Sequence, residues 1–193
     1  MQKLLFTKWT VVISIFIIFG TIFYVTNGKN KNDNEKATVE TVDTKTFKTK
    51  LQPKINELTT NYNDIIEKDW LPAWEEINTN GDSVDRNKLL VTMNAVSKQY
   101  ETIIKEIDTM KNEENITEPH IQKQLVYFTT EFKAASNFMK NAADLIIDGY
   151  NNSTPTNETI ENTKHALGLA DQHIVIALST LNEIKDKLGL SKK

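Results

Sequence analysis

The three histidines are the side chains best suited to metal binding or proton transfer in this chain of 193 residues, which has no cysteine. His165 and His173 are eight residues apart on one predicted helix, about 12 Å along its axis, too far to share an ion. His120 belongs to another predicted helix, and the predicted antiparallel arrangement of the helices places it more than about 20 Å from His165. The Glu-x-x-His motif of di-iron bundles is absent. We therefore expect structural or solvated histidines, no bound metal and no cofactor.

Residues 78–82, with the sequence Asn-Thr-Asn-Gly-Asp, have the composition of part of a calcium-binding loop. If Gly81 takes the sixth loop position, the twelfth position falls on Asn87, where such a loop requires a bidentate glutamate. The end of one helix and the cap of the next explain the same residues more simply.

Catalytic side chains do not form a recognisable set in this sequence. The Ser, Thr, Asp and Glu residues fall at helix caps and on solvent-facing positions, and no nucleophile, base and orienting group can be assembled from their spacing. A glycine-rich phosphate-binding loop is also absent. The sequence therefore predicts a non-catalytic protein.

Two tryptophans provide the strongest candidate for a binding site. Trp70 and Trp74 are one helical turn apart and flank Pro72, and the predicted fold brings them to the same end as Tyr150. The simpler interpretation is that these rings fill the core at a widening end of the molecule. The alternative hypothesis is an apolar recess or exposed patch for a partner protein or ligand, because Trp and Tyr are common anchors of such contacts.

Helical periodicity positions these side chains, with apolar residues at spacings of three and four. In the first segment the apolar stripe shifts by one residue between Ile65 and Ile66, and Pro72 predicts a kink or break near Leu71. Asparagine, glycine, serine, threonine and proline residues mark the connections. The four predicted helical segments cover residues 46–78, 83–111, 117–149 and 155–188.

The similar lengths of these segments and their short connections predict an all-α, up-down-up-down antiparallel four-helix bundle with long, coiled-coil-like helices. At roughly 30 residues each, the helices would be about 45 Å long. A three-helix coiled coil with a loosely packed first segment is the main alternative. The heptad spacing also leaves open a seam shared between two chains, as in a homo-oligomer.

Residues 9–25 form an apolar run without charge or proline, bounded by Trp9 and Tyr24 at the depths where aromatic rings prefer the lipid headgroups. A membrane-spanning helix needs roughly 20 apolar residues, with a lower limit near 17. We therefore expect a short cytoplasmic tail over residues 1–8 and a transmembrane signal anchor over residues 9–26, in contact with the lipid bilayer. If the anchor were cleaved, the remainder would be secreted.

The polar residues 27–45 are rich in Asn, Lys, Thr and Glu and predict a flexible linker, followed by an extracytoplasmic helical bundle over residues 46–190. We expect a single-pass protein of the cell membrane with most of its chain outside the cytoplasm. The abundance of Lys, Asn and Ile and the lack of cysteine favour a Gram-positive bacterium as the source.

The charge distribution argues against nucleic acid as a partner. The formal net charge is −3, Arg86 is the single arginine, and no basic stripe with interleaved aromatic residues is present. We expect a membrane-anchored protein-interaction module whose partner is an envelope protein or an incoming protein. The alternative is a small-molecule-binding or sensor-like ectodomain with a pocket near Trp70 and Trp74.

Overall fold

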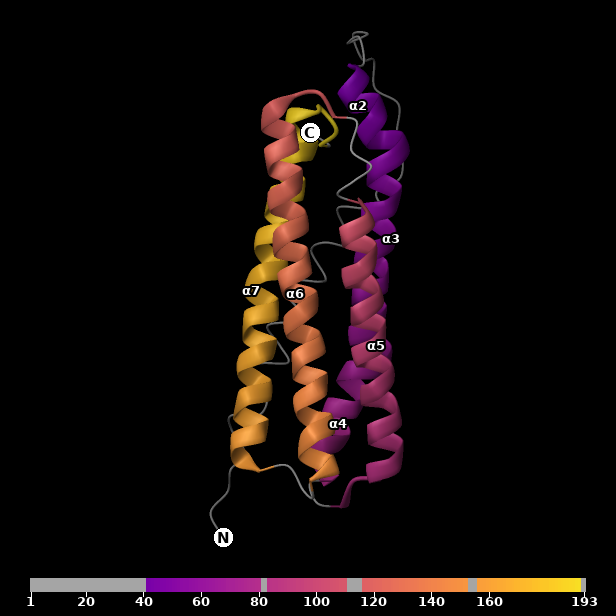
Figure 1. Cartoon of the computed structure of the whole chain (residues 1–193), viewed down its shortest axis with the longest axis vertical. Helices are drawn as coiled ribbons and strands as arrows, with labels where there is room; N and C mark the ends of the chain where they lie inside the picture. Colours follow the sequence, from indigo (N-terminus) through magenta and orange to yellow (C-terminus); the bar gives the residue numbers. More distant parts are fainter. Residues whose placement is uncertain (1–40, 81–82, 111–115, 153–155, 192–193) are drawn as a thin grey trace. The chain divides into compact units, whose positions relative to one another are not determined.

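The computed structural model describes residues 41–80, 83–110, 116–152 and 156–191, which form an all-helical bundle without strands in these ranges (Figure 1). All of them belong to one compact unit, Glu40–Lys193. The prediction of a helical bundle is confirmed. The predicted tail and transmembrane anchor, residues 1–8 and 9–26, lie outside the described residues, as does most of the predicted linker. None of the helices within the described ranges is both long and apolar enough to cross a membrane.

The first helical rod, residues 42–80, is built from five helical pieces that follow one another without a gap. Two of the pieces are wide, π-helical turns, and each is followed at the second residue by a proline, Pro53 or Pro72. In order along the chain the pieces are α2 (Val42–Thr46), the π-helical η1 (Phe47–Leu51), α3 (Gln52–Ile65), the π-helical η2 (Ile66–Trp70) and α4 (Leu71–Asn80).

The π-helical turn η2 corrects the expectation of a broken helix at Pro72. A π-helical turn holds one more residue than an α-helical turn, and the amide of Leu71 donates to the carbonyl of Ile66, five residues earlier. The extra residue moves the buried stripe by one position, so that Ile65 and Ile66 are both buried. The irregularity expected near Leu71 is therefore a wide turn inside a continuous rod, which accommodates the proline without ending the helix.

Three further helices, α5 (Arg86–Met110), α6 (Pro119–Asn151) and α7 (Asn157–Lys187), complete the bundle. Helices that follow one another along the chain are antiparallel, because the residues that join each such pair of helices run in opposite order along the two. Between the first rod and α5, the rings of Tyr62 and Tyr100 are 5.3 Å apart, and Glu76 pairs with Lys88 at 3.7 Å. Two contacts join α5 to α6, namely Ser97–Asp144 and Asp108–Lys133. Two others join α6 to α7, namely Gln124–Glu183 and Glu131–His173.

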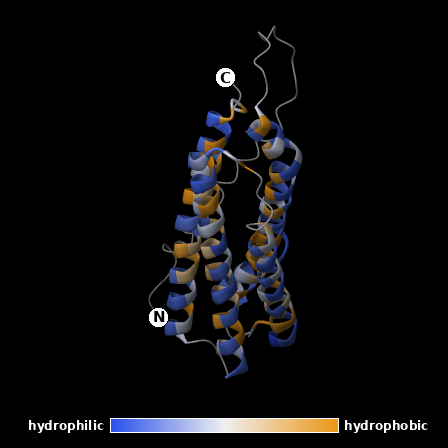
Figure 2. Ribbon diagram, turned by 45° about the horizontal axis from the view of Figure 1, so that its top comes forward, coloured by the Kyte–Doolittle hydropathy of each residue, from blue (hydrophilic) through white to orange (hydrophobic). Residues whose placement is uncertain are grey.

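The core lies along the centre of the bundle, where the apolar stripes of all four rods meet. Nearly every residue of the predicted stripes is buried; Ile160, near the start of α7, is half-buried. Hydrophilic and hydrophobic segments alternate along each helix, as an amphipathic bundle requires (Figure 2). Helices α6 and α7 contact each other along most of their length, because small buried residues such as Ala135, Ala142 and Ala170 allow close approach.

The first described helix begins at Val42, ahead of the predicted boundary between linker and bundle at Thr46. Asp43 explains the difference, because its carboxylate is largely buried and accepts hydrogen bonds from the amides of Thr117 and Glu118, both at 2.9 Å. The hydroxyl of Thr117 also donates to this carboxylate. A polar residue that looked like part of the linker therefore attaches the start of the first rod to the start of α6.

Asp43 is expected to make the bundle less stable at acid pH. The pKa of Asp43 is lower than its ordinary value of 3.8, mainly because the backbone amide of Thr117 donates a hydrogen bond to the carboxylate. Burial acts in the opposite direction, whereas hydrogen bonds from the Glu118 amide and the Thr117 hydroxyl lower the pKa further. The carboxyl of Asp43 therefore binds its proton more tightly in the unfolded chain than in the folded bundle. Ionised Asp43 stabilises the fold above pH 3.8, and this stabilisation is lost as the pH falls through the folded-state pKa.

We expect Asp43→Asn to lower stability near neutral pH and to weaken the loss of stability in acid. The measurement is urea unfolding of the bundle between pH 7 and pH 2.5, with the exposed Glu57→Gln as the control. Unchanged acid sensitivity in Asp43→Asn would show that the contact with α6 does not contribute.

Candidate interaction surface

The predicted aromatic cluster is part of the core. Trp70, Trp74 and Tyr150 are only 1%, 6% and 5% exposed, and the two indole rings stack with centroids 6.1 Å apart. Pro72 is exposed on the other side of the same turn. Helix α4 and the C-terminal part of α6, which carries Tyr150, lie at the same end of the bundle (Figure 1). The three aromatic side chains fill the core instead of forming an exposed patch.

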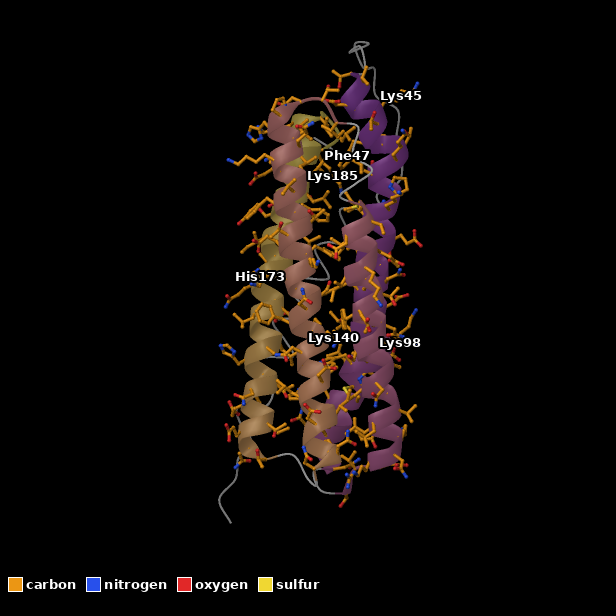
Figure 3. All side chains as sticks on the ribbon, in the orientation of Figure 1. Lys45, Phe47, Lys98, Lys140, His173 and Lys185 are labelled. Carbon is orange, nitrogen blue, oxygen red and sulfur yellow. The ribbon has the colours of Figure 1, made fainter. Side chains whose placement is uncertain are left out.

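The histidines occupy three separate places. His120 and His165 are exposed on α6 and α7, whereas His173 is half-buried midway along α7 (Figure 3). The Nδ1 atom of His173 lies 2.6 Å from a carboxylate oxygen of Glu131, and its ring stacks on Phe138 at 5.4 Å. Within the described ranges, no three metal-binding side chains come together. The pair joins α6 to α7.

A groove of about 360 Å³ lies between the first rod and α5, away from the two tryptophans. Its polar lining includes Asp64, Asp69 and Glu106, and the ammonium group of Lys68 is already paired with Asp64 at 2.8 Å. Two of its nine lining residues, Ile65 and Ile103, are apolar and the other seven are polar or charged, whereas pockets that hold small molecules are lined mainly by apolar side chains.

Exposed apolar side chains distinguish the surface of α6 and α7. In the described part of the chain six large apolar residues are exposed, and four of them form two adjacent pairs. One pair is on α6 and the other is on α7. The four residues and their exposed fractions are Val126 (54%), Tyr127 (49%), Val175 (43%) and Ile176 (36%), which we call the apolar band.

The two pairs lie at the same level of the bundle. Gln124 donates to Glu183 at 2.9 Å, and Glu131 contacts His173, so these two contacts bracket one stretch of the α6–α7 seam. Residues 126–127 lie between the two contacts on α6, and residues 175–176 lie between them on α7. Because the helices are antiparallel, Tyr127 and Ile176 lie on the same α6–α7 face, from positions about 50 residues apart in the sequence. Val126, seven residues before Lys133, lies towards α5, and Val175 lies on the side of α7 away from α6.

Further apolar residues extend the band along the seam. Ala134, Phe138 and Leu145 are half-buried and follow Tyr127 at spacings of seven, four and seven, which keeps them on the same side of α6. On α7, the half-buried Leu169 precedes Ile176 by seven residues. The outer face of α6 and α7 is therefore apolar over several turns.

Charges are sparse along much of α7, although exposed Lys123 lies one turn before Tyr127 on α6 and exposed Glu183 lies seven residues after Ile176 on α7. Between residues 166 and 182, α7 contains one formally charged residue, Asp171. The side chain of Glu131 is only 13% exposed, and Lys133 turns towards α5, where it pairs with Asp108. Intrahelical ion pairs occur on all four rods: Lys68–Asp64, Lys105–Glu101, Lys140–Asp144 and Lys164–Glu161.

Gly168 leaves the backbone of α7 open on the side of the helix that carries Val175, seven residues further on. A methyl group added at Gly168 would meet no atom of the chain within 4 Å. Glycine inside a helix costs roughly 1 kcal/mol relative to alanine, so packing within the chain does not account for it. An open backbone allows another helix to approach closely.

The sequence interpretation missed this surface because it followed the buried stripes. Two signals were present: pairs of adjacent apolar residues outside the heptad positions, at Val126–Tyr127 and Val175–Ile176, and the long stretch of α7 with a single charge. Comparison with protein-family models, curated proteins and solved structures gave no match.

Proposed function

We propose that this chain is a non-catalytic protein-interaction module of the cell envelope, anchored in the membrane through residues 9–26 with its helical bundle on the extracytoplasmic side. The observation that supports it best is the apolar band on α6 and α7, whose four side chains are 36% to 54% exposed. The long apolar run at residues 9–25 supports the membrane anchor.

The apolar band favours a protein partner over a small ligand. Burying apolar surface contributes about 25 cal/mol per Å², and soluble monomers seldom leave large contiguous apolar patches in water. The band lies on the outer side of two packed helices, whereas small molecules bind in concave pockets that enclose most of their surface. Tyr127 adds an aromatic ring of the kind that dominates binding energy at protein interfaces.

Attachment to a membrane through the start of the first rod would leave this face accessible. Asp43 contacts Thr117, and the hydroxyl of Thr44 lies 3.4 Å from the carbonyl of Leu188. The N-terminal ends of the first rod and of α6 therefore lie at the same end of the bundle as the C-terminal end of α7. The proposed linker enters at this end, and the apolar band begins about two turns along α6. A flexible linker would let the band meet a partner beside the bundle.

Photocrosslinking in intact membranes tests the proposal. A photoreactive amino acid at position 127 of the full chain should give a covalent product with a protein, and one at position 91 on α5 should not. Val91 is a matched control because it is an exposed apolar residue outside the band, with 72% of its surface accessible. Recovery of the full chain in the soluble cytosolic fraction, or no protein product from position 127, would contradict the proposed function.

A further inference from the structure

We infer that the end of the bundle where the linker enters binds the anionic headgroups of the membrane lipids, with the helices directed away from the lipid. The inference rests on the proposed function, because it requires the anchor at residues 9–26. Three observations carry it: the excess of lysine at this end, the lack of ion-pair partners for most of these lysines, and the entry of the linker at the same place.

Three of the four rods form this end, which we call the tethered end. Helix α5 stops short of it, because Asp108 of α5 pairs with Lys133 midway along α6 and α5 ends two residues later. Lys45 of the first rod and Lys185 of α7 lie towards this end in Figure 3. The tethered end comprises the described residues 41–54 of the first rod, 117–127 of α6 and 181–191 of α7.

Lysine dominates the charge of the tethered end, which carries seven lysines and four acidic residues. Along the first rod, residues 44–56 include four lysines and no acidic residue, whereas residues 57–80 include six acidic residues and one lysine. The neighbouring residues 111–115 and 192–193, which lie outside the described residues, have three lysines and two glutamates. Basic charge is therefore concentrated where the linker meets the bundle.

Three of the four acidic residues at the tethered end already accept hydrogen bonds within the chain. Asp43 and Glu118 accept from backbone amides around the start of α6, and Glu183 accepts from the side chain of Gln124. Asp186 is exposed and lies between two lysines in the sequence. These carboxylates are therefore held by other donors and do not pair with the lysines around them.

Five of the seven lysines have no ion-pair partner in the part of the chain that the structure describes: Lys45, Lys50, Lys123, Lys185 and Lys187. Lysines towards the far end are paired, as in Lys68–Asp64, Lys88–Glu76, Lys140–Asp144 and Lys164–Glu161. Burial lowers the pKa of the Lys185 ammonium group, so an anion beside it would stabilise its charged form. Uncompensated lysines fit a surface of anionic headgroups, where each one contributes about fivefold to binding.

The linker selects the lipid over other anionic partners. Only residues 27–41 separate the predicted anchor from the first described helix, and a flexible chain of this length has a root-mean-square span of about 20 Å. The tethered end is then held close to the headgroups, at an effective concentration in the millimolar range. Individually weak lysine contacts are sufficient under this condition.

Energy transfer in reconstituted vesicles tests the lipid contact. Because the chain has no cysteine, a donor dye on Thr49→Cys marks the tethered end and one on Thr79→Cys marks the far end of the same rod. The acceptor dye is attached to lipid headgroups. When about 30% phosphatidylglycerol is added to phosphatidylcholine vesicles, transfer from position 49 of the full chain should rise at least about twofold, and transfer from position 79 should not rise.

Two double variants with equal charge change locate the effect. Lys45→Gln with Lys50→Gln should weaken the headgroup contact by at least about tenfold and abolish the rise at position 49, with unchanged helical circular dichroism. Lys68→Gln with Lys98→Gln removes the same charge away from the tethered end and should leave the rise intact. Loss of the rise in both variants would overturn the assignment to the tethered end.

The outcomes separate the lipid contact from the proposed function. Equal transfer from position 49 in both kinds of vesicle would overturn the lipid contact and leave the anchored interaction module standing. A rise at position 79 as large as that at position 49 would overturn the arrangement with the helices directed away from the lipid. Release of the full chain from the vesicles by alkaline carbonate would contradict the anchor, and with it both proposals.

Discussion

Replacing Trp70 with alanine is expected to destabilise the bundle by about 3–5 kcal/mol, the usual cost of removing a large buried aromatic side chain. The indole of Trp70 is 1% exposed and stacks on Trp74, so its removal leaves a cavity and deprives the neighbouring ring of its contact. The wide turn η2 ends at Trp70, and the side chain holds this turn against the core. Urea unfolding monitored by circular dichroism measures the change.

The matched control for this prediction is Tyr127→Ala, which removes a large aromatic side chain from the surface. Tyr127 is 49% exposed, so we expect a change in the free energy of unfolding within about 0.5 kcal/mol in the monomeric bundle. A loss of less than about 1 kcal/mol in Trp70→Ala would contradict the core position of the tryptophan.

Asp171→Asn is expected to stabilise the folded protein at neutral pH. Burial raises the pKa of Asp171 from 3.8 to about 6, since its carboxylate is half-covered on α7. Taken at face value, this shift corresponds to about 3 kcal/mol, and solvent screening of the partly exposed group reduces the expected effect to about 1–2 kcal/mol.

The sign of this effect follows from proton binding. The folded state binds the proton of Asp171 more tightly than the unfolded state, so stability falls as the pH rises from about 4 to about 6 and is constant above that range. The gain in Asp171→Asn should therefore be largest above pH 7 and small at pH 4. An equal gain at both pH values would rule out desolvation of Asp171 as its cause.

The two aspartates act in opposite directions along the pH scale. Asp43 favours the folded state when ionised, because backbone amides donate to its carboxylate. Asp171 favours the folded state when protonated, because burial is the cause of its shift. The contributions of these two groups together therefore place the highest stability near pH 4.

Much of the helical structure could be predicted from the sequence because burial imposes a period of three and four residues. Along α5, the apolar residues at spacings of four and three are all buried: Leu89, Met93, Val96, Tyr100, Ile103, Ile107 and Met110. The one-residue shift between Ile65 and Ile66 was also visible, and it has a structural cause in the π-helical turn η2. Of the kink or break expected near Leu71, the break did not occur, because a wide turn accommodates the ring of Pro72 within a continuous helix.

The site was harder to predict, because it depends on contacts between distant segments. A Trp or Tyr residue suits a core and an interface equally well, so the sequence left the role of Trp70 and Trp74 open until their burial was known. The apolar band depends on the register between α6 and α7, which the Glu131–His173 contact fixes. Local periodicity does not contain this register.

Thiol labelling of intact cells tests the central claim most directly, namely that the bundle lies outside the cytoplasm with the α6–α7 face covered by a protein. Single-cysteine chains carrying Ile176→Cys or Val91→Cys would be treated with a membrane-impermeant maleimide, before and after unfolding in urea. The account predicts rapid labelling at position 91, protection at position 176, and equal labelling of both after unfolding. Equal labelling in intact cells would show that the face is free, and no labelling of either position before lysis would place the bundle inside the cell.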